Sequence, residues 1–277
     1  MNISDKIYAI INLLVLIGLI YWNYTVNTLG INGNTVGSLS REYENLFTPA
    51  SYAFSIWGLI FLGLTAQAIF LIKSSFTKNQ SDFIPKMAPF LIIANLLNGA
   101  WLWFWLTEQT GISVLIMISI LGALILVVLR LNMERWHAPR TIIAWIWWPI
   151  CLYSGWIAVA TIANFSAYLA KINWTGGLDE LTWTLIMILV ATALNLWMIY
   201  TRNMREFALV GAWALIAIAV RHWGAIQEIH WISAAGAVTI ILYAGAHGFK
   251  NRKSNPFYPE KQALKHLKSK DNSEKQH

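Results

Sequence analysis

Long apolar segments separated by short polar ones dominate the chain. About 20 apolar residues cross the roughly 30 Å hydrocarbon core of a bilayer as a helix. Eight segments approach that length with almost no charge between their ends. A membrane β-barrel would instead show segments of about ten residues with alternating polarity, and the sequence has none. The pattern therefore predicts eight membrane helices, over approximately residues 7–26, 52–73, 88–107, 112–131, 142–170, 181–200, 206–223 and 229–248.

Basic residues gather in every second loop. They follow the second, fourth, sixth and eighth predicted helices, whereas the intervening loops are mainly acidic or uncharged. Because Lys and Arg favour the cytoplasmic side of membrane proteins, this alternation predicts an even number of spans with both termini in the cytoplasm. No small-residue cleavage site follows the first apolar segment, so that segment is expected to remain as a helix. The basic residues are Lys73, Lys78 and Lys86; Arg130, Arg135 and Arg140; Arg202 and Arg205; and Lys250, Arg252 and Lys253.

The composition supports a membrane protein. Hydrophobic residues make up 57% of the 277 positions and charged residues 12%, about half the charged fraction of a soluble domain. The net charge of +7 is spread over short loops and a polar tail, which favours membrane lipid over nucleic acid as the partner. A single cysteine, Cys151, excludes an internal disulfide and a multi-cysteine metal site. The histidines near helix ends, His222, His230 and His247, suit the membrane interface, so no metal site is predicted.

Polar and aromatic side chains interrupt the third predicted helix. Asn98, Trp101 and Trp105 fall at positions i, i+3 and i+7, on one helix face, with Asn95 at its edge. An amide in hydrocarbon must form hydrogen bonds, so this face is expected to look into the helix bundle. One interpretation is that the amides join neighbouring helices. The other is that the indole rings and amides line a cavity for a flat aromatic ligand.

The fifth predicted helix repeats this chemistry and is unusually long. Asn164 lies about two turns beyond Trp156, and Pro149 is expected to bend the segment. A bend toward the third helix would bring Trp and Asn residues from both helices to one pocket. The predicted stripe consists of Trp145, Trp148, Leu152 and Trp156.

The loop between the first and second predicted helices is the longest of the loops outside the cytoplasm. Its first half is rich in Gly, Asn and Ser, as in a plain connector. Its second half, around Tyr43, Phe47 and Pro49, is more apolar than a connector requires. The loop is therefore either a connector or a lid over a cavity.

These residues resemble the tryptophan-rich sensory protein or translocator protein (TspO/MBR) family. The third helix of that family has an Asn followed three residues later by Trp, as in "LNGAW" here, and its fifth has a Trp, seven residues and Asn-Phe, as in "WIAVATIANF". The segment "EYENLFTPASYAFSIW" takes the place of its loop and second helix. The loop departs from the family at Glu42 and Thr48, where Trp and Lys are usual, and its double proline is reduced to Pro49. The residues that match are Phe54, Trp57, Asn98, Trp101, Trp156 and Asn164.

The resemblance implies an all-α integral membrane protein that extends the five-helix family fold. A five-helix bundle is expected over residues 1–175, three additional membrane helices over 176–250 and a charged cytoplasmic tail over 251–277. The implied location is a bacterial cytoplasmic membrane, with a homodimer as one option for assembly.

The resemblance also implies a function: a membrane receptor or binding protein for a planar hydrophobic ligand, in tetrapyrrole or stress signalling. A porphyrin or other tetrapyrrole, such as a haem precursor, or a sterol-like lipid would be the ligand, and no resident cofactor is implied. Two alternatives stay open: a transporter of small hydrophobic molecules, although no internal repeat is visible, and an enzyme that degrades porphyrins in light, although no nucleophile and base or acid pair stands out. The implied ligand-binding residues are Tyr52, Phe54, Trp57, Asn98, Trp101, Trp156 and Asn164.

Overall fold

Helices form almost all of the chain in the computed structural model, which describes residues 3–77, 82–136, 138–174 and 176–251. A 3-10 helix, η1 (Ser51–Ser55), precedes α3, and a π-helical turn, Ile143–Trp147, joins α6 to α7. The predicted charged tail, from residue 252 onward, lies outside the described residues. The α-helices are α1 (Ile3–Leu29), α2 (Val36–Glu42), α3 (Ile56–Ser75), α4 (Ile84–Leu106), α5 (Thr110–Arg130), α6 (Arg140–Ile142), α7 (Trp148–Lys171), α8 (Glu180–Arg202), α9 (Arg205–Arg221) and α10 (Gln227–Lys250).

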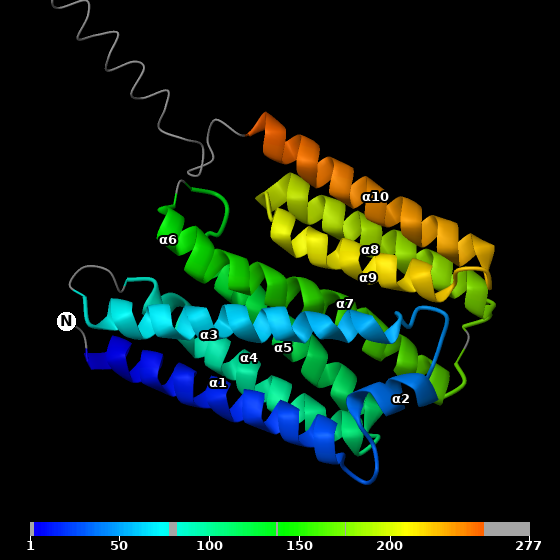
Figure 1. The fold of residues 1–277 in the computed structure, drawn as a ribbon, viewed down its shortest axis with the longest axis horizontal. Coiled ribbons are helices and arrows are strands. Elements are labelled where there is room, and N and C mark those ends of the chain that lie inside the picture. Colours follow the sequence, from blue (N-terminus) through cyan, green and yellow to red (C-terminus); the bar gives the residue numbers. More distant parts are fainter. Residues whose placement is uncertain (1–2, 78–81, 137, 175, 252–277) are drawn as a thin grey trace, which may run out of the picture.

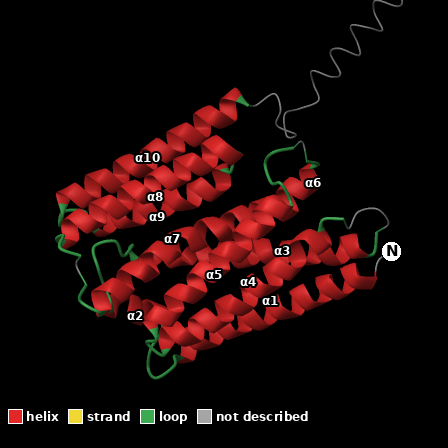
Figure 2. Cartoon of the chain, turned by 180° about the vertical axis from the view of Figure 1, so that it is seen from behind, coloured by secondary structure: helices red, strands yellow, loops and turns green. Residues whose placement is uncertain are grey.

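Five long helices close into a ring, and three more pack beside it. Around the ring, α1 contacts α3 and α4, α4 contacts α5, and α7 closes the circle against α5 and α3. The group of α8, α9 and α10 lies against α7 through α9 (Figures 1 and 2). The described ends of the chain, at the start of α1 and the end of α10, lie at the same end of the molecule (Figure 1). We call this end, which also carries the basic loops, the basic end.

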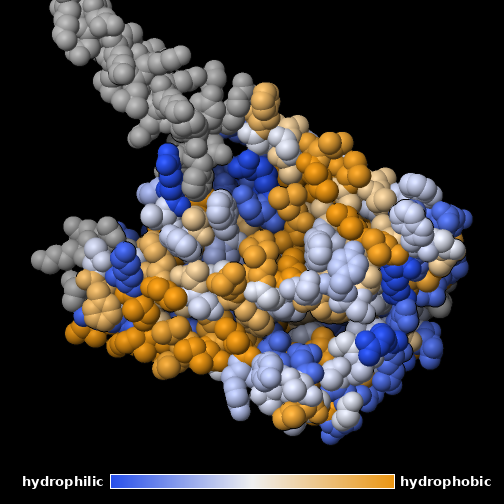
Figure 3. All heavy atoms as spheres, viewed as in Figure 1, coloured by the Kyte–Doolittle hydropathy of each residue, from blue (hydrophilic) through white to orange (hydrophobic). Residues whose placement is uncertain are grey.

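The predicted class, an all-α multi-pass membrane protein, is confirmed, but the count of eight spans is not. Among the residues that the structure describes, seven helical segments are long and apolar enough to cross a membrane. The exception among the eight predicted spans is α9, which has 17 residues and is only about 26 Å long at 1.5 Å per residue. The sides of α1, α3 and α10 expose many apolar side chains (Figure 3), as expected for surfaces that face lipid.

The fifth predicted span is less regular than the sequence pattern indicates. Pro149 has no backbone N–H to donate to the carbonyl group four residues earlier, and the π-helical turn lies directly before it. Such a turn adds a residue, so the side chains before it and after it no longer follow one regular helical stripe. The predicted stripe is therefore broken: Trp145 and Trp148 are 45% and 38% exposed, whereas Trp147 and Trp156 are each 2% exposed.

Helix α9 is the wall that the two helix groups share. One face, including Phe207, Val210 and Ala214, belongs to the core of the five-helix ring. The opposite face, including Ala212 and Leu215, belongs to a second core with α8 and α10. Since both faces are covered by protein, a helix shorter than the bilayer is accommodated here.

Glycines set the close approach of α9 to its neighbours. A Cβ atom on Gly155 of α7 would lie 2.7 Å from the backbone oxygen of Phe207 and 3.1 Å from Cβ of Val210. On Gly211 of α9 it would lie 2.3 Å from the side chain of Asn195 in α8. Small residues at such crossings allow membrane helices to pack backbone to backbone.

We predict that Gly155→Ala destabilises the contact between α7 and α9, because backbone atoms cannot move aside as a flexible side chain would. The free energy of unfolding, measured by denaturant titration in detergent, should fall by about 1–3 kcal/mol. Gly122→Ala in α5 is the matched control, since a Cβ atom there meets nothing within 4 Å. Equal losses in the two variants would contradict the close-packing role of Gly155.

Candidate functional site

A small cavity of about 60 Å³ lies inside the ring, at the end of the molecule opposite the basic end. It is covered by α2 and by residues 43–52, which we call the lid segment. The walls come from η1, α3, α4, α5 and α7 and are mostly aromatic or apolar. The lining residues are Val36, Ser40, Tyr43, Thr48, Pro49, Phe54, Trp57, Trp101, Trp105, Met117, Trp156, Val159, Ala160, Ala163, Asn164 and Ala167.

The aromatic walls are packed against one another. Phe54 meets Trp156 edge to face, with ring centroids 5.9 Å apart. Trp101 stacks on Trp105, one helical turn further along α4, at a centroid distance of 6.0 Å. Trp57 packs against Phe61 and Tyr153 rather than against the other cavity indoles. Such contacts contribute about 0.5–1.5 kcal/mol each beyond area burial, so they hold the rings in defined orientations.

A chain of hydrogen bonds fixes the polar side of the cavity. Trp101 Nε1 donates to Asn164 Oδ1 at 2.8 Å, and Asn164 Nδ2 donates to Ser113 Oγ at 2.9 Å. Ser113 Oγ also lies 2.7 Å from the backbone oxygen of Thr110. The chain joins α4, α7 and α5, and all three side chains are buried. Asn164 therefore lines the cavity and at the same time connects three helices.

Two of the implied ligand-binding residues do not line the cavity. Asn98 Nδ2 donates to the hydroxyl group of Tyr153 at 2.9 Å, so this amide connects α4 to α7 away from the cavity. Tyr52 is 40% exposed and packs edge to face on Trp213 of α9, with centroids 5.3 Å apart. The structure brings together the other implied residues, Phe54, Trp57, Trp101, Trp156 and Asn164.

Trp105 is a cavity residue that is not among the implied ligand contacts. Its side chain is 4% exposed, and in the part of the chain that the structure describes its Nε1 atom has no hydrogen-bond partner. An unpaired buried donor costs about 1–3 kcal/mol. The indole N–H thus offers a hydrogen bond to an acceptor. The sequence indicates this residue through its spacing: Trp105 follows Trp101 by four residues, so the two side chains share one helix face.

One end of the lid segment is held by a group of polar contacts. The hydroxyl group of Tyr43 donates to Glu108 Oε2 at 2.5 Å, and Lys171 Nζ lies 3.8 Å from the same oxygen. The hydrogen bond from Tyr43 lowers the pKa of Glu108, and the charge of Lys171 adds to this effect. Burial, followed by the contact with Glu108, raises the pKa of Tyr43 far above its usual value. At neutral pH the donor is therefore protonated and the acceptor ionised, as the contact requires.

The middle of the lid segment is held by the end of α9. Arg221 Nη1 donates to the backbone oxygens of Asn45 at 3.0 Å and Thr48 at 2.6 Å, while Nη2 forms an ion pair with Glu44. His222 Nε2 lies 2.9 Å from the backbone oxygen of Leu46. Because a carbonyl oxygen only accepts, this nitrogen carries the hydrogen, and burial lowers the pKa of the ring.

Further contacts complete this attachment of the lid segment to the C-terminal helices. Phe47 is buried in the core of α8, α9 and α10. The backbone N–H of Ala50 donates to the oxygen of Ala217 at 3.1 Å, and Trp213 Nε1 donates to the oxygen of Ala53 at 3.2 Å. The partners of Arg221 lie more than 170 residues away in the chain, so no local sequence pattern indicates them.

A larger groove of about 570 Å³ lies on the other side of the aromatic wall. It is bordered by the end of α1, the start of α2, and parts of η1, α3 and α4. Phe54, Trp57 and Trp101 line both the groove and the inner cavity. The side chains of Phe54 and Trp57, which are only partly buried, therefore stand between the two spaces. In the described ranges, no group of three His, Cys, Asp or Glu residues is placed to hold a metal ion.

Comparison with known proteins identifies a family. A family model described as "TSPO-like protein" matches residues 9–246, a range that includes α8, α9 and most of α10 as well as the five-helix ring. Comparisons with curated proteins and with solved structures found no match.

We predict that Asn164→Ala destabilises the protein by about 1–3 kcal/mol, because it leaves the buried indole N–H of Trp101 without an acceptor. Thr161→Ala is the control on the same helix, since Thr161 donates only to the backbone oxygen of Ile157 in its own helix. Denaturant titration in detergent gives both free energies of unfolding. Similar values for the two variants would mean that the Trp101–Asn164 bond does not hold α4 to α7.

Proposed function

Because the chain belongs to the TSPO-like family, we propose that it binds a planar hydrophobic ligand of the porphyrin or related tetrapyrrole class, beneath the lid segment. The observation that carries this proposal is a cavity lined by four indole rings, a phenyl ring and a buried amide, in which one indole N–H has no partner among the described residues. Aromatic walls suit a flat conjugated ring, and few polar groups suffice to orient it. The N–H of Trp105 would donate to a carboxylate or carbonyl group on the ligand.

The ligand requires more space than the closed cavity offers. Pockets for ligands of this size enclose roughly 300–1,000 Å³, whereas the inner cavity has about 60 Å³. Rotation of Phe54 and Trp57 would join the cavity to the groove of about 570 Å³ between α1, α3 and α4. A hydrophobic ligand would then reach the site from the side, through the bilayer, while the lid segment closes the site at the membrane surface.

The site lies at the end of the molecule away from the basic loops. Since Lys and Arg favour the cytoplasmic side, we place the basic end in the cytoplasm and the lid segment at the opposite surface. Ligand bound beneath the lid segment would thus be taken up from the outer leaflet or from the space beyond it. A receptor role follows if ligand binding shifts α9, which contacts both the lid segment and the basic end.

Binding to the aromatic walls is tested with protoporphyrin IX and the double variant Trp57→Leu/Trp156→Leu. The porphyrin absorption band, titrated with purified protein, should show at least a tenfold weaker affinity, equal to about 1.4 kcal/mol. Trp197→Leu is the control, because Trp197 is 65% exposed on α8, outside the lining of the cavity and the groove. Unchanged affinity in the double variant, or an equal loss in the control, would contradict the site assignment.

The attachment of the lid segment to α9 is tested by Arg221→Gln, which removes the ion pair with Glu44 and weakens both carbonyl contacts. A looser lid segment should speed both association and dissociation of protoporphyrin IX, measured by stopped-flow quenching of tryptophan fluorescence. The control Arg41→Gln removes a charge from α2 at an exposed position. If both variants keep wild-type rates, the lid segment does not govern access to the site.

A further inference from the structure

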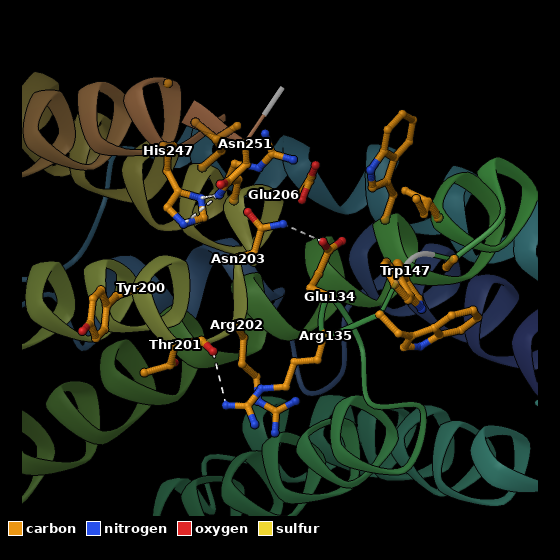
Figure 4. A pocket seen from close by; sticks show the side chains of 18 of the residues that line it. Glu134, Arg135, Trp147, Tyr200, Thr201, Arg202, Asn203, Glu206, His247 and Asn251 are labelled. Atoms are coloured by element: carbon orange, nitrogen blue, oxygen red, sulfur yellow. Dashed lines mark hydrogen bonds between the residues drawn. The ribbon is translucent and has the colours of Figure 1, made fainter. Parts of the chain in front are cut away.

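A second, larger cavity opens at the basic end, far from the lid segment. It has a volume of about 810 Å³ and lies between the loop before α6, the turn between α8 and α9, and the end of α10 (Figure 4). Charged and amide side chains from all three segments point into it, including Glu134, Arg135, Arg202, Arg205 and Glu206. The aromatic cavity and its lid segment use none of these residues.

Two guanidinium groups form the most distinctive part of this cavity. Arg135 comes from the loop after α5 and Arg202 from the last turn of α8, and their charges are close enough to act on each other (Figure 4). Arg135 Nη2 donates to the backbone oxygen of Thr201 at 3.3 Å. Neither guanidinium forms an ion pair with a carboxylate in the described part of the chain. Two like charges held together in this way favour an anion between them.

The pair is held in position by contacts between its two loops. Besides the bond from Arg135 to Thr201, Asn203 Nδ2 donates to Glu134 Oε2 at 3.0 Å. Asn203 adopts a left-handed backbone conformation, with φ of 57°, at the end of α8. This conformation is favoured by Asn among residues with a side chain, and it sets the turn into α9. These two hydrogen bonds join the loop that carries Arg135 to the end of α8, which carries Arg202.

Several buried polar atoms around the cavity lack partners. Within residues 3–77, 82–136, 138–174 and 176–251, this applies to Arg202 Nη1, Arg205 Nε, Asn203 Oδ1 and Glu206 Oε2. The first two are donors attached to a positive charge, and an unpaired charged group costs more than the 1–3 kcal/mol or so of a neutral one. An oxyanion would supply acceptors to both. A hydroxyl group attached to that anion would serve Asn203 and Glu206.

The acidic side chains of the cavity do not exclude an anion. Burial and the nearby charge of Glu206 raise the pKa of Glu134 to about 7, so its carboxyl group is only partly ionised at neutral pH. The cationic side chains at the cavity are Arg135, Arg202 and Arg205, and positive charge therefore predominates.

We propose that the Arg135–Arg202 pair binds a phosphate group at the basic end of the protein. Guanidinium forks match the oxygen geometry of phosphate and bind it through two parallel hydrogen bonds. The phosphate could belong to a free ion or to the headgroup of a lipid. A lipid headgroup is favoured by the exposed apolar side chains of Leu209 and Ile241 at the cavity, which would lie beside the acyl chains.

The proposal is tested on the full chain in detergent with three soluble probes: inorganic phosphate, short-chain phosphatidylglycerol, and a short-chain diacylglycerol without phosphate. A probe that binds the folded state but not the unfolded state stabilises the protein by RT ln(1 + [L]/Kd), and it therefore raises the midpoint of thermal unfolding. We expect at least one phosphate probe to raise the midpoint of the wild type, and the diacylglycerol not to. A rise with both phosphate probes identifies the phosphate group itself as sufficient, whereas a rise with the lipid alone identifies a headgroup site.

The double variant Arg135→Gln/Arg202→Gln should lose the response to phosphate. Arg130→Gln should keep it, since Arg130 ends α5 at the same end of the molecule but packs on Phe90, 5.1 Å from the ring centroid. If the double variant does not fold, Arg135→Gln serves alone, because the Arg135 side chain is exposed, and it should reduce the rise by removing one of the two charged donors. The proposal is overturned if neither phosphate probe shifts the wild type, or if the arginine variants respond as the wild type does.

Discussion

The rule that polar groups inside a bilayer must find partners within the protein governs this structure. The chain Trp101–Asn164–Ser113 satisfies that rule by joining α4, α7 and α5 at the cavity, and Asn98 with Tyr153 makes a second link between α4 and α7. These bonds set the positions of the helices that carry the aromatic walls. The cavity is therefore a consequence of how these side chains are paired, and in the described part of the chain its lining residue Trp105 keeps a buried indole N–H without a partner.

Helix α9 connects the five-helix ring and its cavity to the rest of the molecule. It lies between the two cores and packs on α7 through Gly155. Its end holds the lid segment through Arg221 and His222, and its start borders the cavity of the Arg135–Arg202 pair. The three C-terminal helices are thus part of the arrangement around the aromatic cavity, in agreement with a family match that runs through them. The lid segment and the cavity at the basic end therefore contact the two ends of one helix.

Much of this architecture follows from periodicity and local motifs. Apolar length places each long helix to within a few residues, and the spacing of Trp and Asn correctly marks the faces of α4 and α7 that meet. Local patterns do not separate Asn164, which lines the cavity, from Asn98, which does not. Each amide shares a helix face with a Trp, since Trp101 follows Asn98 by three residues and Asn164 follows Trp156 by eight. They also miss the π-helical turn at Ile143–Trp147, where Trp147 is buried while Trp145 and Trp148 are exposed. The partners of Arg221 and of Arg202 lie in distant loops, so only the folded chain brings them together.

The central claim is that ligand occupies the space between Trp156 and Asn164 on α7, and Ala160 lies between these two residues on the same stripe. Ala160→Leu adds three carbons, enough to fill most of a cavity of about 60 Å³, without removing any hydrogen bond. The most direct measurement is the affinity of this variant for protoporphyrin IX, alongside its thermal stability. Our account predicts that binding is lost while the variant remains folded. Wild-type affinity in a folded Ala160→Leu protein would contradict it.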